Sequence, residues 1–347
     1  MGAERTHKKE NFPNSKFHIM KNFYHICLTA HSEVLLRSEE DVALMTNLSA
    51  LAAYRSGTEM LTDSQMSTHL HETVLCNDPR RFVWSQQLSI TKAFNHRHGR
   101  KGKLFDGKPY VIQLQGPRHM QMALNYSLRQ GMHHGQSETA FDYPWSTCNQ
   151  IFQKERGVAV SSAATCRRSD VKEFMPKNAD FPDTWQVDSN GILIRNCFEE
   201  IALVENWYGT ARSYMYAMMR KTSEEWLQEQ TRDEIEGPIV TLGLLEKGYS
   251  NEEIDAMFSQ EGNSKYTQKS LSDMELCKII DNQMLGRFKK DSVYGLSESQ
   301  KQSLAAELKF DLGIKSEKQI SRCLAMKYDA LIPAGQFSLP SKFIGTI

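Results

Sequence analysis

His69 and His71 are the first residues in this sequence whose type and spacing could support chemistry. On a β-strand, alternate side chains project from the same face, so the two imidazoles would share one side with about 7 Å between their α-carbons. Two imidazoles at that separation can bind one metal ion. Glu72 would point to the opposite face, and we therefore do not expect it to be a ligand.

Tyr126 and Gln130 form a second pair with a useful spacing. Residues four apart on a helix lie one above the other, so both could face the histidines if the mostly apolar side of that helix packs on a sheet. A tyrosine with the ordinary pKa of about 10 is a weak nucleophile at neutral pH, and a cation or a base must assist its deprotonation. Two imidazoles and one amide oxygen leave a divalent ion with open positions, which suits Mg²⁺ or Mn²⁺ bound to phosphate oxygens. Together these groups could cleave a phosphodiester through a phosphotyrosine. An ordinary half-exposed histidine pair and a tyrosine that serves only in packing are the alternative interpretations.

The elements that must position these residues alternate between strands and helices. Ser38 followed by Asp41 is typical of a capping box, and Asp78 before Pro79 is typical of a helix start. The predicted order is strand 17–31, helix 38–57, two strands within 58–75, a helix after 78, strand 110–114 and a helix from 116 to near 131. This order predicts an α+β fold, with a ferredoxin-like βαββαβ catalytic domain, helices on one face of its sheet and an added tyrosine-bearing helix.

Beyond this region the sequence changes character. Ser, Ala, Asn, Pro and charged residues predominate up to about residue 191, and the pattern afterwards is wholly helical. We therefore expect a catalytic domain at 12–155, a linker at 156–191, a helical domain at 192–290 and a C-terminal segment at 291–335. The C-terminal segment resembles a helix-turn-helix; because Pro333 ends its third helix early, a dimerisation or degenerate module is the alternative interpretation. Helices are expected near 196–208, 211–221, 223–234, 238–247, 250–260, 271–285, 299–312 and 316–325.

Charge is balanced over the whole chain but not locally. The sequence has 42 Lys and Arg against 42 Asp and Glu, so no global field indicates an anionic partner. The stretch from 92 to 108 is almost entirely positive, which predicts a surface for a polyanion such as DNA. A solvated loop is the alternative interpretation. The basic residues of the stretch are Lys92, Arg97, Arg100, Lys101, Lys103 and Lys108.

Cysteines and hydropathy indicate the compartment. The seven cysteines are scattered without a CxxC pair, which is typical of a reducing environment rather than a disulfide framework. The polar N-terminal stretch lacks a signal-peptide core, and no window approaches the roughly 20 apolar residues of a membrane span. We therefore expect a cytoplasmic protein that has no membrane partner.

Four stretches of the chain form an ordered set of motifs. They are 24–26 (YHI), 66–71 (MSTHLH), 94–105 (FNHRHGRKGKLF), and the tyrosine segment 125–130 (NYSLRQ) followed by 142–146 (DYPWS). This set resembles the HUH-type single-tyrosine transposases, specifically the group of REP-associated tyrosine transposases. The sequence departs from the family at Thr68, where members have Asn, and at Gln130-Gly131, where members have Asn-Pro.

The resemblance implies roles for the residues already singled out. His69 and His71 would be metal ligands, Tyr126 the nucleophile and Gln130 the third ligand position. The family has a ferredoxin-like fold and acts on single-stranded DNA and on hairpins formed by repeated palindromic elements. The stretch from Asn95 to Lys103 would contact phosphates, whereas the motif at 142–146 would serve in packing.

The leading hypothesis is a metal-dependent endonuclease and strand transferase that acts on single-stranded or hairpin DNA through a covalent tyrosine. One alternative is an inactive DNA-binding protein or repressor derived from such a transposase. Another is a metal-dependent hydrolase of small phosphate compounds, which accounts poorly for the basic stretch. The DNA sequence recognised, homodimer formation, the use of Tyr126 in cis or in trans, and a mobile-element or host role are left open.

Overall fold

A four-stranded antiparallel sheet lies at the centre of the N-terminal part of the protein. The computed structural model describes residues 21–30, 33–105, 108–158, 164–165, 167, 169–171, 174–219 and 271–327. The strands are β1 (Asn22–Thr29), β2 (Glu59–Gln65), β3 (His69–Cys76) and β4 (Tyr110–Gln113), in the order β2-β3-β1-β4. Every neighbouring pair is antiparallel. This strand order confirms the predicted α+β class and the ferredoxin-like arrangement.

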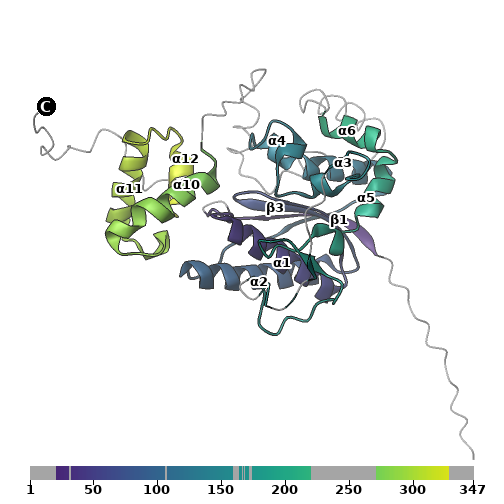
Figure 1. Ribbon diagram of the computed structural model, residues 1–347, viewed down its shortest axis with the longest axis horizontal. Coiled ribbons are helices and arrows are strands. Elements are labelled where there is room, and N and C mark those ends of the chain that lie inside the picture. The colour runs from purple at the N-terminus through teal and green to yellow at the C-terminus, as the bar shows by residue number, and fades with distance from the viewer. Residues whose placement is uncertain are drawn as a thin grey trace, which may run out of the picture.

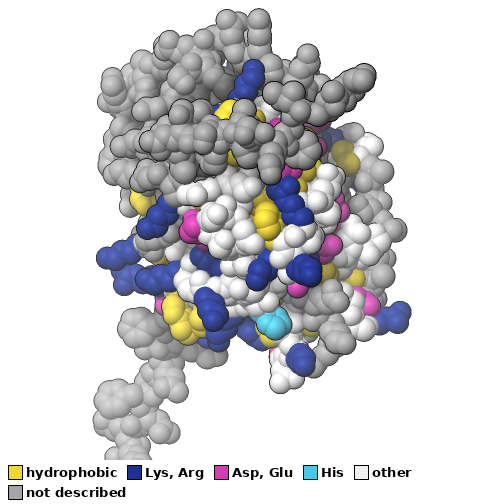
Figure 2. Space-filling view, turned by 90° about the vertical axis from the view of Figure 1, so that its left-hand side faces the viewer, with side chains coloured by type: hydrophobic (Ala, Val, Ile, Leu, Met, Phe, Trp, Pro, Cys, Tyr) yellow, Lys and Arg dark blue, Asp and Glu magenta, His cyan; other side chains and the backbone are white. Residues whose placement is uncertain are grey.

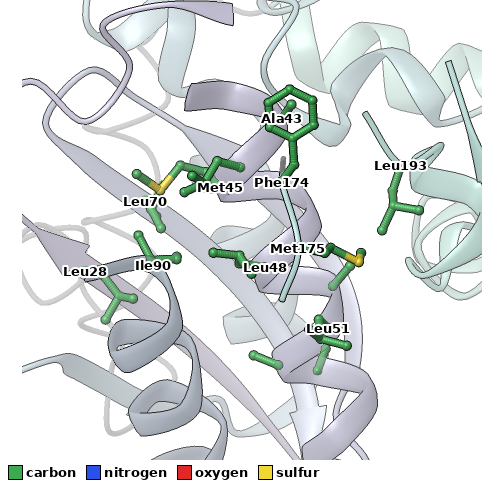
Figure 3. Close-up of a cluster of buried hydrophobic side chains, with 14 of the residues drawn as sticks. Leu28, Ala43, Met45, Leu48, Leu51, Leu70, Ile90, Phe174, Met175 and Leu193 are labelled. Carbon is green, nitrogen blue, oxygen red and sulfur yellow. The ribbon is translucent and has the colours of Figure 1, made fainter. Parts of the chain in front are cut away.

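Two long helices cover one face of the sheet, α1 (Glu39–Ser56) and α2 (Pro79–His98), as Figure 1 shows. Both begin where the sequence indicates: Ser38 and Asp41 form a capping box, and the Asp78 side chain accepts hydrogen bonds from the first-turn amides of α2. Satisfying these otherwise unpaired amides stabilises the helix starts. The two helices pack their apolar sides on the sheet in a core that includes Leu28, Leu48, Leu70 and Ile90 (Figure 3).

A second layer of helices covers the opposite face. It consists of α3 (Gly116–Leu128), α4 (Gln130–His133), α5 (Ile201–Tyr208) and α6 (Ala211–Met219) (Figure 1). Their core joins Leu124 and Tyr126 of α3 to Val204 of α5 and Tyr214 of α6. The helix expected to continue from 116 to near 131 is interrupted at Arg129, so Gln130 begins a separate short helix.

The segment expected to be a linker contributes to the packing around α1. Phe174, Met175 and Trp185 are buried in the same hydrophobic cluster as α1, as is Leu193 just beyond the segment, and the side chain of Asn47 on α1 bonds the backbone of Gly191 and Leu193. Figure 3 shows Phe174, Met175 and Leu193 beside this core. Two short strands, β5 (Ala164–Thr165) and β6 (Gln186–Val187), pair antiparallel, and a 3₁₀ turn follows at Arg195–Cys197.

The C-terminal described residues form an all-helical unit. It contains α10 (Asp273–Ile279), a π-helical turn (Ile280–Met284), two 3₁₀ turns (Leu285–Phe288 and Val293–Gly295), α11 (Glu298–Phe310) and α12 (Glu317–Cys323). We call residues 271–327 the C-terminal module. Residues on both sides of position 290 share one hydrophobic core, which includes Leu276, Leu304 and Ile320.

The helices expected at 223–234, 238–247 and 250–260 and the final residues 328–335 lie outside the described residues. In the described part of the chain, every helix is too short or too polar to span a bilayer.

Candidate functional site

The two histidines of β3 and the tyrosine of α3 meet in the layer between the sheet and α3. The rings of His69 and His71 are 5.1 Å apart between centroids and nearly perpendicular, at 77°. The ring of Tyr126 lies 5.1 Å from that of His71, at 86°. Strand β3 presents both imidazoles to this face because they are two residues apart. Three side chains from two elements, β3 and α3, therefore come together where the sequence predicts chemistry.

A third histidine, His25 of β1, supports this group and was not predicted to belong to it. Its Nε2 is 3.2 Å from Nδ1 of His71, and its Nδ1 is 3.4 Å from the hydroxyl oxygen of Ser127 on α3. Burial lowers the pKa of His25 to about 3. The pKa of His71 is also well below its usual value, because of burial first and of the neighbouring His69 second. Both imidazoles are therefore neutral at physiological pH.

The chain of contacts from Ser127 through His25 to His71 orients the imidazole of His71. When His71 donates from Nδ1 to His25, its Nε2 carries the lone pair that a metal ion requires. The Sγ atom of Cys27, its partner across the β1–β3 pair, lies 4.0 Å from this Nε2. A neutral imidazole fixed by a buried neighbour has the properties of a metal ligand.

His133 and His134 extend the cluster. The ring of His134 lies 4.8 Å from that of His69, and the ring of His133 lies 5.6 Å from that of Tyr126. Burial, Arg129 and His134 hold the pKa of His133 well below its usual value. Both ring nitrogens of His133 are shielded from solvent and have no hydrogen-bond partner among the described residues. From the sequence, the simplest interpretation of these two histidines is a favourable position at a helix C-terminus, with a ligand or base role as the alternative. Their proximity to His69 and Tyr126 follows from the fold.

Gln130 lies beside Tyr126 but not on the same helix. Its side-chain nitrogen donates to the main-chain oxygen of Tyr126 at 3.0 Å, and the residue is buried. The adjacent Gly131 lies directly under the ring of Tyr143, where an added Cβ would be 2.3 Å from the Cβ of Tyr143. The hydroxyl of Tyr143 donates to the main-chain oxygen of Gln65 at 2.6 Å, which holds the ring over α4. Tyr143 therefore packs, as its motif implies, and fixes where α4 lies.

The histidine pair fits a divalent cation in its chemistry. Two imidazoles in nearly perpendicular planes can direct lone pairs to a common point when each is deprotonated at the nitrogen that faces the ion. Glu72 points to the other face as predicted, where the side chain of Gln86 donates to it. Among the described residues, no group of three or more His, Cys, Asp or Glu side chains is arranged to hold a metal ion. Remaining ligands would have to be amide, water or phosphate oxygens.

The basic stretch divides into exposed and internally bonded side chains. Arg97 pairs with Glu40 at 3.5 Å and with Asp41 at 3.3 Å, and the Asn95 amide donates to the main-chain oxygen of Gly102 at 2.7 Å. Arg100 pairs with Glu33 on a neighbouring segment. Lys92, Lys101, Lys103 and Lys108 are exposed to solvent, as is Arg97 despite its ion pairs. Figure 2 shows Lys and Arg side chains spread over one face of the molecule with Asp and Glu between them, so the positive charge there is distributed.

The sequence matches no protein-family model and no curated protein. A solved structure described as the REP-associated tyrosine transposase bound to a REP hairpin is similar, with 11% sequence identity and a TM-score of 0.34. The match covers 46% of this chain and 89% of that chain. Because this TM-score is low, the fold assignment rests on the strand order and helix layers described above.

Proposed function

We propose that the protein is a metal-dependent single-strand DNA endonuclease and strand transferase of the HUH type, with Tyr126 as the nucleophile. The observation that carries the proposal is the 5.1 Å separation between the rings of Tyr126 and His71, beside the perpendicular ring of His69. The sequence motifs around these residues support the same interpretation. The proposed substrate is single-stranded DNA or a DNA hairpin, as in the family that the motifs resemble.

In this proposal the Tyr126 oxygen attacks the phosphorus of one phosphodiester. A bond forms between that oxygen and phosphorus, one ester P–O bond breaks, and the departing oxygen takes a proton to become a free hydroxyl. The tyrosine proton leaves to a base or to solvent. The phosphotyrosine retains the energy of the broken ester, so a second strand's hydroxyl can reverse the step and complete strand transfer.

Packing prepares the phenol for this step. Tyr126 is buried against the rings of His71, His25 and His133, which limits the positions its side chain can adopt. Holding a nucleophile in one orientation lowers the entropic part of the barrier. The site has neutral imidazoles rather than carboxylates, so it does not repel an incoming phosphate by like charge.

His69 and His71, with the amide oxygen of Gln130, are the residues that would hold Mg²⁺ or Mn²⁺. The bound cation would withdraw charge from the phosphate and stabilise the negative charge that develops during the reaction. Exposed Lys101 and Lys103 would contact backbone phosphates of the same DNA and make binding depend on salt concentration.

The direct test is to mix the full chain with end-labelled hairpin DNA and Mn²⁺ and to separate the products under denaturing conditions. We expect a DNA–protein adduct that resists detergent and that does not form when EDTA is present during the reaction. Tyr126→Phe should abolish it, and His71→Ala should reduce it by at least roughly 10²-fold. Tyr54→Phe, an exposed tyrosine of α1, is the matched control and should form the adduct like the wild type.

Two outcomes would contradict the proposal. An adduct that persists in Tyr126→Phe would assign the nucleophile elsewhere. Tight hairpin binding without any adduct, unchanged by Tyr126→Phe and His71→Ala, would favour the inactive DNA-binding protein instead.

A further inference from the structure

The short segment Glu33–Arg37 lies where three parts of the molecule meet. Val34 is buried in the core of the C-terminal module, whereas Leu35 is buried in the core between the sheet and α1. The amide of Leu35 donates to the main-chain oxygen of Ser67 at 2.6 Å, two residues before His69. The segment therefore contacts the module and the turn that begins the histidine strand.

Glu33 connects the module to the basic stretch. One carboxylate oxygen accepts from Nε of Arg100 at 2.9 Å, and the other accepts from the hydroxyl of Tyr294 at 2.6 Å. The guanidinium of Arg100 also lies over the ring of Tyr294, 5.9 Å from its centroid. Tyr294 belongs to the module and is largely buried, and burial with the adjacent Glu33 raises its pKa, so its hydroxyl remains a donor. Hydrogen bonds to an ionised group are among the stronger ones in proteins.

Arg100 in turn forms the centre of the loop that follows α2. Its guanidinium donates to the side-chain oxygen of Asn95 at 2.9 Å and to the main-chain oxygens of Lys101, Gly102 and Lys103. The loop closes around this group, helped by the left-handed conformation of Gly102, with φ of 91°. The position of Arg100 therefore fixes the backbone from which exposed Lys101 and Lys103 extend.

A second contact fixes the module against the same segment. Arg37 is buried and bonds both carboxylate oxygens of Asp281 at 2.8 to 3.2 Å. It also donates to the main-chain oxygen of Cys323 at 2.9 Å. A bidentate Arg–carboxylate pair has a fixed geometry, so the module does not slide along the segment while this pair is intact.

We propose that Glu33 and Tyr294 are positioning residues through which the C-terminal module sets the conformation of the basic loop at residues 99–103. Tyr294 holds Glu33, Glu33 holds Arg100, and Arg100 holds the backbone of the loop. The module thus acts on the presentation of Lys101 and Lys103 without contacting DNA at these positions. The consequence for DNA rests on the proposed function, whereas the coupling itself does not.

Hydrogen exchange of the full-length protein without DNA tests the coupling. Tyr294→Phe keeps the ring and its packing but removes the donor to Glu33. We expect amides of residues 99–103 to exchange roughly tenfold faster, because a bond to a charged acceptor is lost, while amides of β3 exchange at the wild-type rate. Tyr54→Phe is the control and should change neither region. Unchanged exchange at 99–103 in both Tyr294→Phe and Glu33→Gln would overturn the proposal.

Measurements of DNA binding distinguish a positioning role of Arg100 from a direct contact between Arg100 and a phosphate. Arg100→Lys keeps the positive charge but lacks the planar group that the loop encloses. If Arg100 positions the loop, Arg100→Lys and Arg100→Gln should both weaken single-strand binding by roughly tenfold. If Arg100→Lys binds DNA with wild-type affinity while Arg100→Gln does not, Arg100 serves only as a positive charge and the proposal is contradicted.

The adduct reaction adds a second readout. Tyr294→Phe should raise the DNA concentration that gives half-maximal adduct formation and leave the rate at saturating DNA unchanged. A lower rate at saturation would contradict a role limited to the loop. If the wild-type protein binds no DNA, the proposed function fails but the exchange result still decides the coupling. If binding is normal and exchange at 99–103 does not respond, only the coupling fails.

Discussion

At the scale of single residues, His25 is the group that orients the imidazole of His71. It lies behind His71, bonded through Nε2 to Nδ1, and burial keeps it neutral. Neighbours that orient a metal-binding imidazole commonly change metal affinity by about 10- to 100-fold when removed. His25→Phe should therefore weaken Mn²⁺ binding by about that factor, as measured by calorimetric titration.

The control for this variant is His96→Phe on the exposed side of α2, which should bind Mn²⁺ like the wild type. Equal Mn²⁺ affinity in His25→Phe and the wild type would show that His71 does not depend on His25. No Mn²⁺ binding by the wild-type protein would instead count against the metal site itself.

Glu72 shows why the other face of β3 is structural. It lies directly opposite Asp63 in the β2–β3 pair, and burial together with the Asp63 carboxylate raises the pKa of Glu72 well above its usual value. The folded protein therefore keeps a proton that the unfolded chain has released above about pH 4.5. By linkage, this carboxyl makes the fold lose stability as the pH rises from 5 to 8.

Replacing Glu72 by Gln removes this ionisation and keeps an acceptor for the Gln86 amide. Glu72→Gln should unfold with a free energy about 1–2 kcal/mol higher than the wild type at pH 8 and similar at pH 5, measured by urea denaturation. Glu155→Gln, on the exposed surface, should follow the wild-type pH dependence. The same decline from pH 5 to 8 in Glu72→Gln and the wild type would contradict a buried protonated Glu72.

The site residues that the sequence predicts are related by local spacing, whereas those that it misses are brought together by contacts between segments far apart in sequence. His69 and His71 share a face because of local strand periodicity, so their pairing is visible in the sequence. His25 reaches His71 only through the register of β1 with β3, which sets His25 opposite Thr73. No local pattern encodes that register, and the same holds for His134 beside His69.

At the scale of elements, the interruption between α3 and α4 sets where Gln130 lies. Helical spacing predicts one continuous helix. In the structure the ring of Tyr143 packs directly on Gly131, where a Cβ atom would not fit, and α4 is a separate helix. Such a contact cannot be predicted from helix propensity because its partner comes from a later loop. The helix starts of α1 and α2 could be predicted because their caps are local.

Gly131→Ala tests this packing. The added Cβ would lie 2.3 Å from the Cβ of Tyr143, next to rigid backbone, so α4 or the ring must move. We expect a loss of about 1–3 kcal/mol in the free energy of unfolding, measured by urea denaturation. Gly286→Ala is the control because a Cβ added there would meet nothing within 4 Å. A loss below about 0.5 kcal/mol at Gly131 would show that the site is not tightly packed.

At the scale of the whole molecule, the sheet separates two layers: one contains packing residues, and the other contains the histidines and Tyr126. α1 and α2 bury the apolar and acidic side of the sheet, whereas α3, α5 and α6 enclose the side with the histidines and Tyr126 (Figure 1). The alternation of strands and helices predicts this sheet. The packing of residues 174–193 on α1 and the docking of the C-terminal module through Arg37 depend on contacts far apart in sequence, and the sequence alone does not reveal them.

The central claim is that Tyr126 becomes covalently joined to DNA. Peptide mapping by mass spectrometry, after the protein has reacted with hairpin DNA and Mn²⁺ and been digested with nuclease and protease, tests it most directly. We expect the nucleotide-derived mass on the peptide containing Tyr126, with fragment ions that place it on that side chain. The same mass on another residue, or its absence while the DNA is nonetheless cut, would contradict the account.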